Sequence, residues 1–150
     1  MIDIYKQEWC SLLERSSVLY DYRQFKVNFT YENYLDILPR KYRFYFCRLR
    51  LSVHPLKIQT GRHDNNNIPR EQRYCQCCNL LDLEDECHFV CVCPGFIDIR
   101  KKYIKRYYYI RPSMFKFNEL LNSQSKNILI SLSKYIEESL SSRNAILNSL

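Results

Sequence analysis

The sequence predicts a mainly helical protein, and three observations support this fold class. Only two glycines occur in 150 residues, which disfavours a fold built on β-hairpins, because hairpin turns favour glycine. Several segments repeat apolar residues at the three- and four-residue spacing of an amphipathic helix. Hydrophobic residues make up 46% of the chain, enough for one modest core. We therefore expect a single folded unit composed mainly of helices.

The N-terminal part of the chain contains four segments with helical or mixed patterns. Residues 4–15 place apolar side chains close to one helical face, which predicts a helix. Residues 18–29 are rich in aromatic side chains but mixed in period, so an extended segment and a short helix both stay open. A short helix over 31–38 ends before Pro39, because a residue that precedes proline disfavours the helical conformation. Residues 40–53 fit both a strand and a helix, and the wider apolar stripe favours a helix.

A long loop separates these segments from the C-terminal part. Proline, glycine and a run of asparagines between 55 and 69 are typical of turns and predict this loop. The next helix carries His88 and ends at or before Cys93, since Pro94 disfavours continuation. Three further helices are predicted over residues 94–109, 113–122 and 125–143.

Residues 75–93 hold a dense group of side chains that bind metals. Two thiols two residues apart, followed about ten residues later by an imidazole and another thiol, match the spacing of a structural zinc site. Thiolate and imidazole are also the ligands that Zn²⁺ prefers. The alternative is a set of buried thiols without a metal beside a core histidine. The candidate ligands are Cys75, Cys77, Cys78, Cys87, His88, Cys91 and Cys93.

Spacing ranks the ligands of the first pair. Cys75 and Cys78 leave the two-residue gap that is typical of zinc knuckles. A pair that includes Cys77 would need a tighter and less usual backbone. We therefore predict Cys75 and Cys78 as the first two ligands.

The second pair offers two choices. His88 and Cys91 lie at i, i+3 of a continuous helix, whereas His88 and Cys93 leave four residues between them. Spacing alone does not decide between these pairs. The four-residue gap falls in the range that is common for zinc fingers, and Pro94 supplies the helix end that this pair needs. We prefer Cys93 and keep Cys91 as the alternative.

These ligands predict a small helical domain with a structural zinc knuckle. Four nitrogen and sulfur ligands close the coordination shell of Zn²⁺ and leave no position for a reactive water. No catalytic motif occurs elsewhere in the chain, so we predict that the protein is not an enzyme. The chain divides into an N-terminal helical region (1–63), a zinc knuckle with the following helix (64–112) and C-terminal helices (113–150).

The charge of the chain favours an anionic partner. The net charge is +7 and the isoelectric point is about 9.0, which favours nucleic acid or an acidic surface. Two basic runs, 40–62 and 100–116, contain no acidic residue and are interleaved with tyrosine and phenylalanine. Cations neutralise phosphates, and aromatic faces stack on unpaired bases at about 1–3 kcal/mol each. The alternative is that the cations are solvated helix faces and the aromatic residues form the core. The predicted nucleic-acid contacts are Arg40, Lys41, Arg43, Arg48, Arg50, Arg62, Arg100, Lys101, Lys102, Lys105 and Arg106.

The sequence also bears on the compartment. Charged residues occupy the place where the apolar part of a secretory signal would begin. No apolar run approaches the roughly 20 residues of a membrane span. We expect a protein of the nucleus or cytoplasm that is neither secreted nor associated with a membrane.

A series of short motifs extends through residues 48–103. The motifs are Gly61-Arg62-His63, Ile68-Pro69-Arg70-Glu71-Gln72-Arg73, the cysteine pair, the histidine, and Cys93-Pro94. This arrangement resembles the region C-terminal to the reverse transcriptase domain of non-LTR (LINE-type) retrotransposon proteins. The resemblance implies a CCHC zinc module that helps the polymerase to hold its RNA template or target DNA. It also implies the ligand set Cys75, Cys78, His88 and Cys93, which decides against Cys91.

Together, these observations predict a zinc-binding, nucleic-acid-binding module of retrotransposon origin. Its partner would be RNA or single-stranded DNA, bound in a manner that weakens steeply with salt. The alternative is a structural zinc module that docks on another protein, such as the polymerase part of a retroelement polyprotein, without binding nucleic acid. Docking of that kind predicts exposed apolar surface on the terminal helices.

Overall fold

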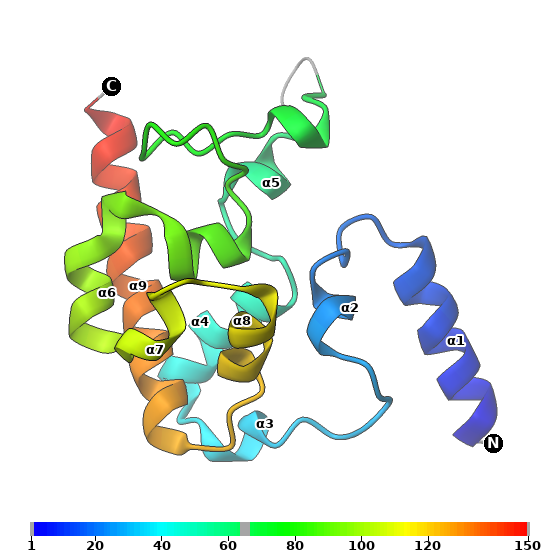
Figure 1. Ribbon diagram of the computed structural model, residues 1–150. Coiled ribbons are helices and arrows are strands. Elements are labelled where there is room, and N and C mark those ends of the chain that lie inside the picture. The colour runs from blue at the N-terminus through cyan, green and yellow to red at the C-terminus, as the bar shows by residue number, and fades with distance from the viewer. Residues whose placement is uncertain (1, 64–66, 150) are drawn as a thin grey trace.

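A computed structural model of the protein describes residues 2–63 and 67–149. Within these residues the fold is mainly helical, as predicted, and strand pairing is limited to one isolated antiparallel bridge between Tyr74 and Leu83. Figure 1 shows the arrangement of the elements. The elements are α1 (Ile2–Arg15), α2 (Tyr22–Phe25), α3 (Tyr34–Ile37), α4 (Arg40–Arg50), α5 (Lys57–Thr60), η1 (Arg70–Gln72), η2 (His88–Val92), η3 (Pro94–Phe96), α6 (Ile97–Tyr103), α7 (Arg106–Tyr109), α8 (Met114–Leu121) and α9 (Lys126–Asn148).

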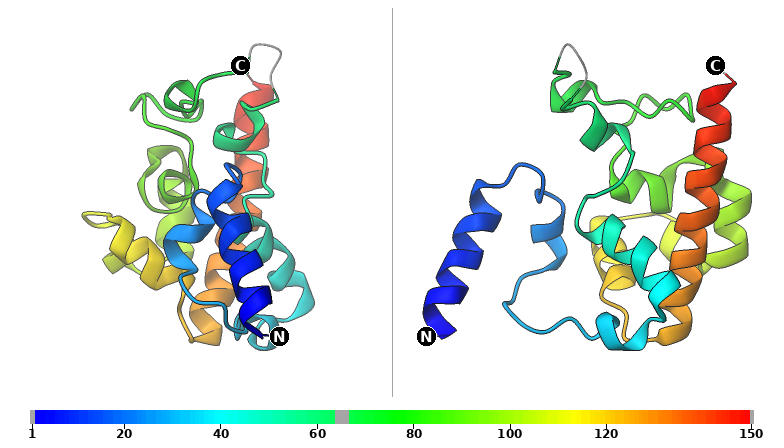
Figure 2. Two further views of the ribbon diagram at one scale, coloured as in Figure 1. Left: turned by 90° about the vertical axis from the view of Figure 1, so that its right-hand side faces the viewer. Right: turned by 180° about the vertical axis from the view of Figure 1, so that it is seen from behind.

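The long helix α9 is the centre of the fold. Helices α4 and α6 both pack against α9, which lies between them (Figures 1 and 2). Leu132 and Tyr135 of α9 are fully buried, as is Phe46 of α4. The buried residues of α9 recur at helical spacing because one face of an amphipathic helix covers the core.

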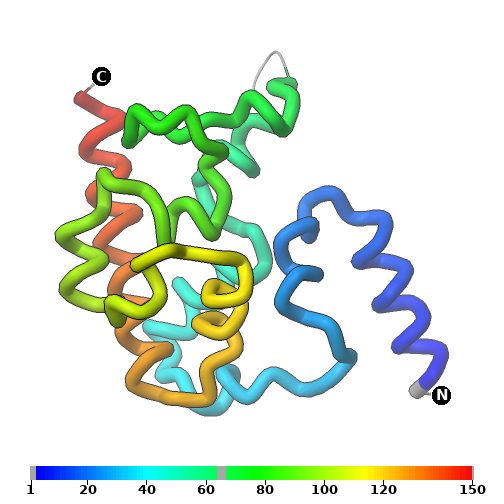
Figure 3. The backbone as a smooth tube through the Cα atoms, viewed as in Figure 1, coloured from blue at the N-terminus to red at the C-terminus, as the bar shows by residue number. Residues whose placement is uncertain are grey.

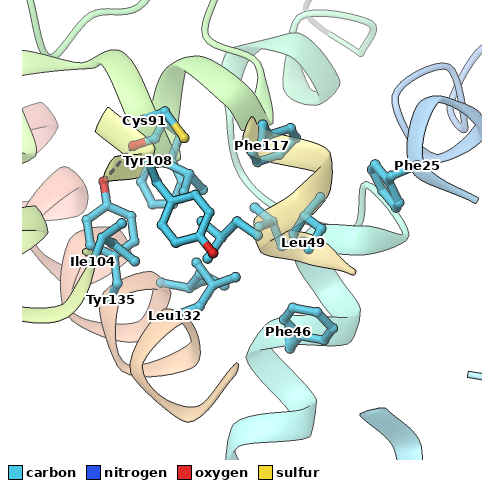
Figure 4. Packing of buried hydrophobic residues seen from close by; sticks show 14 of the residues in the cluster. Phe25, Phe46, Leu49, Cys91, Ile104, Tyr108, Phe117, Leu132 and Tyr135 are labelled. Atoms are coloured by element: carbon cyan, nitrogen blue, oxygen red, sulfur yellow. Dashed lines mark hydrogen bonds between the residues drawn. The ribbon is translucent and has the colours of Figure 1, made fainter. Parts of the chain in front are cut away.

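One buried cluster joins residues from all three regions of the chain. Figure 4 shows side chains of this cluster that come from α2, α4, α8 and α9. Phe25 of α2 meets Phe117 of α8 edge to face, with ring centroids 6.5 Å apart. Phe89 of η2 meets Phe96 at 5.2 Å and Tyr135 at 5.7 Å. The segment that carries the candidate metal ligands His88 and Cys93 is therefore packed directly on the main core.

Helix α1 lies at the edge of the molecule (Figures 2 and 3). Leu13 is buried, and the Trp9 ring contacts Phe29 with centroids 5.6 Å apart. Tyr5 and Leu12 are 59% and 65% exposed. The predicted helix forms, but much of its apolar face is open to solvent.

Several predicted elements are shorter or broken. The helix predicted over 40–53 ends at Arg50, because Ser52 has a φ of 56°, a left-handed conformation that helices do not continue through. The helix predicted over 94–109 divides into η3, α6 and α7. The backbone is extended at Ile104, and this break turns α7 toward α8, which it contacts.

None of the helices in the described part of the chain combines the length and the apolar character that a membrane span requires.

Candidate metal centre

The structure brings together the side chains of Cys75, Cys78, His88 and Cys93. Their ligand atoms all lie within 4.8 Å of one another. Cys75 and Cys78 lie in a loop that the Tyr74–Leu83 bridge closes. His88 begins η2, and Cys93 follows its last residue. These four side chains can hold a metal ion.

The distances between the donor atoms fit a tetrahedral ion. Cys75 Sγ lies 3.8 Å from Cys93 Sγ, and Cys78 Sγ lies 3.5 Å from His88 Nε2. Zn–S bonds of about 2.3 Å place two sulfurs of a tetrahedron about 3.8 Å apart, and the shorter Zn–N bond brings sulfur and nitrogen slightly closer. These two pairs of donor atoms therefore have the spacing of a zinc tetrahedron, and the whole set lies within 4.8 Å.

A π-helical turn sets the spacing of the second pair. The Cys93 N–H donates to the His88 carbonyl at 2.8 Å, so the turn spans five residues instead of four. Asp85 Oδ1 accepts a hydrogen bond from the His88 N–H at 2.8 Å and starts the turn. The helix that carries His88 ends at Val92, which agrees with the prediction from Pro94. This wider turn brings the ligand atoms of His88 and Cys93, at the two ends of η2, close to each other.

The surroundings of the thiols favour a thiolate at Cys75. Its pKa is lowered to about 4, first by a hydrogen bond from the Cys93 thiol and further by His88 and by the Cys77 backbone N–H. The pKa of Cys93 is raised because its proton is held against Cys75 and because it is buried. A thiolate is the form that binds a metal.

His88 is oriented as a metal ligand. Its Nε2 faces Cys78, and its Nδ1 lies 3.7 Å from a carboxylate oxygen of Asp82. Histidines that bind metals commonly turn their second nitrogen toward a carboxylate, which orients the ring. At 3.7 Å, the Asp82 carboxylate lies just beyond hydrogen-bond distance of Nδ1, which has no hydrogen-bond partner among the described residues.

A second group of possible ligands shares one residue with the first. Cys75, Cys77 and Glu84 also lie close together. Burial raises the pKa of Cys77 to about 12, and the Glu84 carboxylate accepts two hydrogen bonds from Arg143. This group has only three donors, so the set with four nitrogen and sulfur donors fits zinc better.

Cys91 lies among the buried hydrophobic side chains (Figure 4). Its thiol interacts with that of Cys87, which lowers the pKa of Cys91 and raises that of Cys87. Within residues 2–63 and 67–149, Cys91 belongs to neither group of possible metal ligands. The structure therefore favours Cys93 over Cys91.

Of the four acidic residues between the ligand pairs, Asp82 is exposed and the other three are buried or half-buried. Glu84 and Glu86 are 1% and 2% exposed. Glu86 Oε1 lies 2.7 Å from His54 Nε2 and accepts a hydrogen bond from Ser52, while Asp85 starts η2. No local sequence signal identifies these partners, because they lie on other elements. Glu84, Asp85 and Glu86 therefore bond to other parts of the fold around the site.

The structure corrects two of the predicted nucleic-acid contacts. Arg50 and Arg100 are each 1% exposed. Arg50 pairs with Glu32 and donates to the Leu121 carbonyl at 2.8 Å. Arg100 donates to the carbonyls of residues 89, 90 and 93 at 3.3, 2.7 and 2.8 Å. Neither guanidinium can reach a phosphate in solvent, because each satisfies buried acceptors instead.

The other predicted contacts lie on both sides of α9. Two of them are partly buried: Arg43 donates to the Leu38 carbonyl, and Arg62 donates to Ser17. Lys41 and Lys102 pair with acidic residues of α9. The exposed cations of the predicted set are Arg40, Lys41, Arg48, Lys101, Lys102, Lys105 and Arg106. Helix α9 lies between α4 and α6, the helices that carry several of these cations.

No family model, curated protein or solved structure matches the chain. The resemblance to non-LTR retrotransposon proteins stays a prediction.

We expect Gly95→Ala to weaken zinc binding. A Cβ at Gly95 would lie 2.6 Å from the Cys77 carbonyl oxygen, so the loop that carries Cys75 and Cys78 would have to move away from Cys93. Overpacking of this kind costs about 1–3 kcal/mol. Competition with a chromophoric chelator measures the change in affinity. Gln76→Ala, an exposed position in the same loop, is the control, and equal affinities for the two variants would contradict the prediction.

Proposed function

We propose that this protein is a zinc-binding module that contacts nucleic acid, of the kind found after the reverse transcriptase domain of non-LTR retrotransposon proteins. The observation that carries the proposal is the group of four donor atoms within 4.8 Å of one another. Three sulfurs and one imidazole nitrogen are soft and borderline ligands, which favour Zn²⁺ over magnesium or calcium. The closed ligand set supports a structural role for the ion.

The ion would fasten a loop to the core. Residues 74–83 form a loop with one β-bridge whose apolar side chains Tyr74, Leu80 and Leu81 are exposed, whereas η2 is packed on the core through Phe89. Zinc would join the loop ligands Cys75 and Cys78 to the ligands at the two ends of η2. In small zinc modules this bond supplies much of the folding free energy.

A basic and aromatic patch supports the nucleic-acid contact. We call it the α7–α8 patch and define it as Arg106, Tyr107, Ile110, Arg111 and Phe115. Its side chains are exposed, and Phe115 is 74% exposed. The sequence contains no acidic residue between 99 and 118, and Glu119, just after this range, accepts a hydrogen bond from the Tyr107 hydroxyl. Cations beside exposed rings suit single-stranded nucleic acid, whose phosphates and bases are both accessible.

The patch is connected to the metal centre. Helix α7 packs against η2, which begins at His88, and also against α8. Zinc that fixes the position of η2 would therefore also fix the surface on which α7 packs. This connection supports a single module in which the metal positions the binding surface.

We expect the α7–α8 patch to bind single-stranded RNA or DNA when zinc is bound. Arg106→Gln and Arg111→Gln should each reduce the salt dependence of binding, by about 0.7 in the slope of log K against log salt. Phe115→Ala should cost about 1–3 kcal/mol because one stacked base is lost. Fluorescence anisotropy with labelled oligonucleotides over a salt series measures both effects.

Lys134→Gln is the matched control for this series. Lys134 is an exposed cation on α9, outside the patch. Equal weakening by Lys134→Gln and Arg106→Gln would show that net charge, and not the patch, determines binding. Zinc-loaded protein that ignores RNA and single-stranded DNA at low salt would contradict the nucleic-acid proposal.

The second candidate is a zinc module that docks on another protein. The observation that favours it is the exposed apolar face of α1, where Ile4, Tyr5 and Leu12 are open to solvent. A zinc-loaded protein without nucleic-acid affinity, together with a stable complex with a polymerase domain that Leu12→Glu disrupts, would favour this candidate.

A further inference from the structure

A buried ion pair adjoins the candidate metal centre. Arg143 of α9 donates from Nε and Nη2 to the two carboxylate oxygens of Glu84, each at 2.7 Å. Arg143 is 4% exposed and Glu84 is 1% exposed. Such a bidentate pair has a fixed geometry. Its two residues are 59 positions apart in the chain, so the pair joins the end of α9 to the metal-ligand segment.

The pair directly contacts one ligand. Cys75 Sγ lies 3.9 Å from Glu84 Oε1. Burial by itself would lower the pKa of Arg143, but the hydrogen bonds and charge of Glu84, and then the thiols of Cys77 and Cys75, raise it. The guanidinium therefore lies within electrostatic reach of the thiols that would bind the ion.

The net charge of the zinc-bound site would be negative, so a buried cation beside it would stabilise it. Three thiolates, a neutral imidazole and a divalent zinc ion carry one net negative charge. The Glu84 carboxylate adds a second negative charge beside Cys75. Arg143 extends from α9 to Glu84 and supplies a buried positive charge. Without it, two negative groups would adjoin each other away from water, where their repulsion is strong.

Arg143 also contributes to the attachment of the end of α9. After Ser139, it is the only buried residue in the described part of α9, and Leu140 and Ile146 are partly buried against the core. The last turns of the helix are thus attached to the body through this ion pair together with these apolar contacts. A contact between the metal centre and α9 would connect occupancy of the site to the position of the C-terminal turns.

We propose that Arg143 is a positioning residue of the metal centre, where its charge balances the zinc–thiolate cluster through Glu84. The inference rests on the proposed zinc site and goes beyond it. Glu84 anchors Arg143 and also accepts a hydrogen bond from the Lys57 N–H at 2.5 Å. Because their charges are opposite, Arg143 and Glu84 are expected to have opposite effects on zinc affinity.

Opposite effects of two substitutions test the proposal. Arg143→Met removes the cation and leaves Glu84 beside the negative cluster, so zinc affinity should fall by about 10-fold or more, as for other residues that support ligands. Glu84→Gln removes the anion and leaves Arg143 to face the thiolates alone, so zinc affinity should rise. A pair that served only to hold the fold together would give a fall in both variants. Chelator competition on the full chain measures the affinities.

The absorption spectrum of the Co²⁺-substituted protein provides a second measurement. It would not change if Arg143 had a purely structural role. In the Co²⁺-substituted protein, the energy of the sulfur-to-metal charge-transfer band reports the electrostatic potential at the thiolates. Arg143→Met should shift the band to lower energy, and Glu84→Gln should shift it to higher energy. Arg143→Lys keeps the charge and should restore the parent band.

Arg50→Met is the matched control. Arg50 is also a buried arginine in an ion pair, with Glu32, and should leave the cobalt band in place. If Arg143→Met does not fold, the isosteric Glu84→Gln variant still gives a sign. A fall in zinc affinity for Glu84→Gln, or an unmoved cobalt band in both variants, would overturn the inference while the zinc site stands. A parent protein that binds no zinc would overturn the zinc site itself and the inference with it.

Discussion

Cys93→Ser is expected to reduce the zinc content from about one ion per chain to nearly none. The substitution removes one of the four donors, namely the sulfur that lies 3.8 Å from Cys75 Sγ. An ion that binds only the folded state stabilises it by about 4 kcal/mol when free zinc is 1,000 times the dissociation constant. We therefore expect a loss of about this size in the free energy of unfolding. Mass spectrometry of the metal content and thermal unfolding with and without chelator measure the two effects.

Cys91→Ser is the control for this experiment. Cys91 is also buried, but its thiol interacts with Cys87 in the core. The variant should keep its zinc and lose only a modest part of its stability. Loss of zinc from the Cys91 variant together with retention in the Cys93 variant would overturn the ligand set.

Arg100→Met is expected to have the second large effect, and this effect should be on stability. The guanidinium donates to the carbonyls of Phe89, Val90 and Cys93 and to the Tyr135 hydroxyl. Each buried acceptor that loses its donor costs about 1–3 kcal/mol. The Phe89 carbonyl keeps its hydrogen bond from the Tyr135 hydroxyl, so the main loss falls on the carbonyls of Val90 and Cys93. This loss is still a large fraction of the total stability of an ordinary domain. Chemical denaturation measures the loss.

Lys101→Met is the matched control, because Lys101 is the neighbouring exposed cation. It should change the free energy of unfolding by less than about 0.5 kcal/mol. The comparison also tests the correction to the sequence-based assignment. A stable Arg100→Met protein with weakened nucleic-acid binding would show that Arg100 acts at the surface after all.

The sequence predicted the features that depend on neighbours along the chain. Helical periodicity located α1, α4, α8 and α9, and Pro94 located the end of η2. The ligands Cys75, Cys78, His88 and Cys93 lie within one short segment, so their spacing alone restricted the geometry. The π-helical turn between the last two ligands was not predicted, because its five-residue hydrogen bond has no sequence signature that differs from an ordinary helix end.

The basic residues show where sequence reasoning ends. Arg100 and Lys101 are adjacent in the same basic run, yet one is 1% exposed and the other is open to solvent. A helix turns by about 100° per residue, so adjacent residues face different directions, and only packing against α9 decides which of them is buried. On α4, it is likewise the packing of the helix that decides the burial of Arg50.

By itself, the sequence determined the helical class and the candidate ligands, because helical periodicity and ligand spacing are local properties. Only the tertiary structure decided between buried and exposed cations, and only it paired Glu84 with Arg143. That pair joins residues 59 positions apart, and a contact of this kind depends on how the helices pack. The candidate metal ligands could thus be identified from the sequence, whereas the charged residues around them are brought together only by the fold.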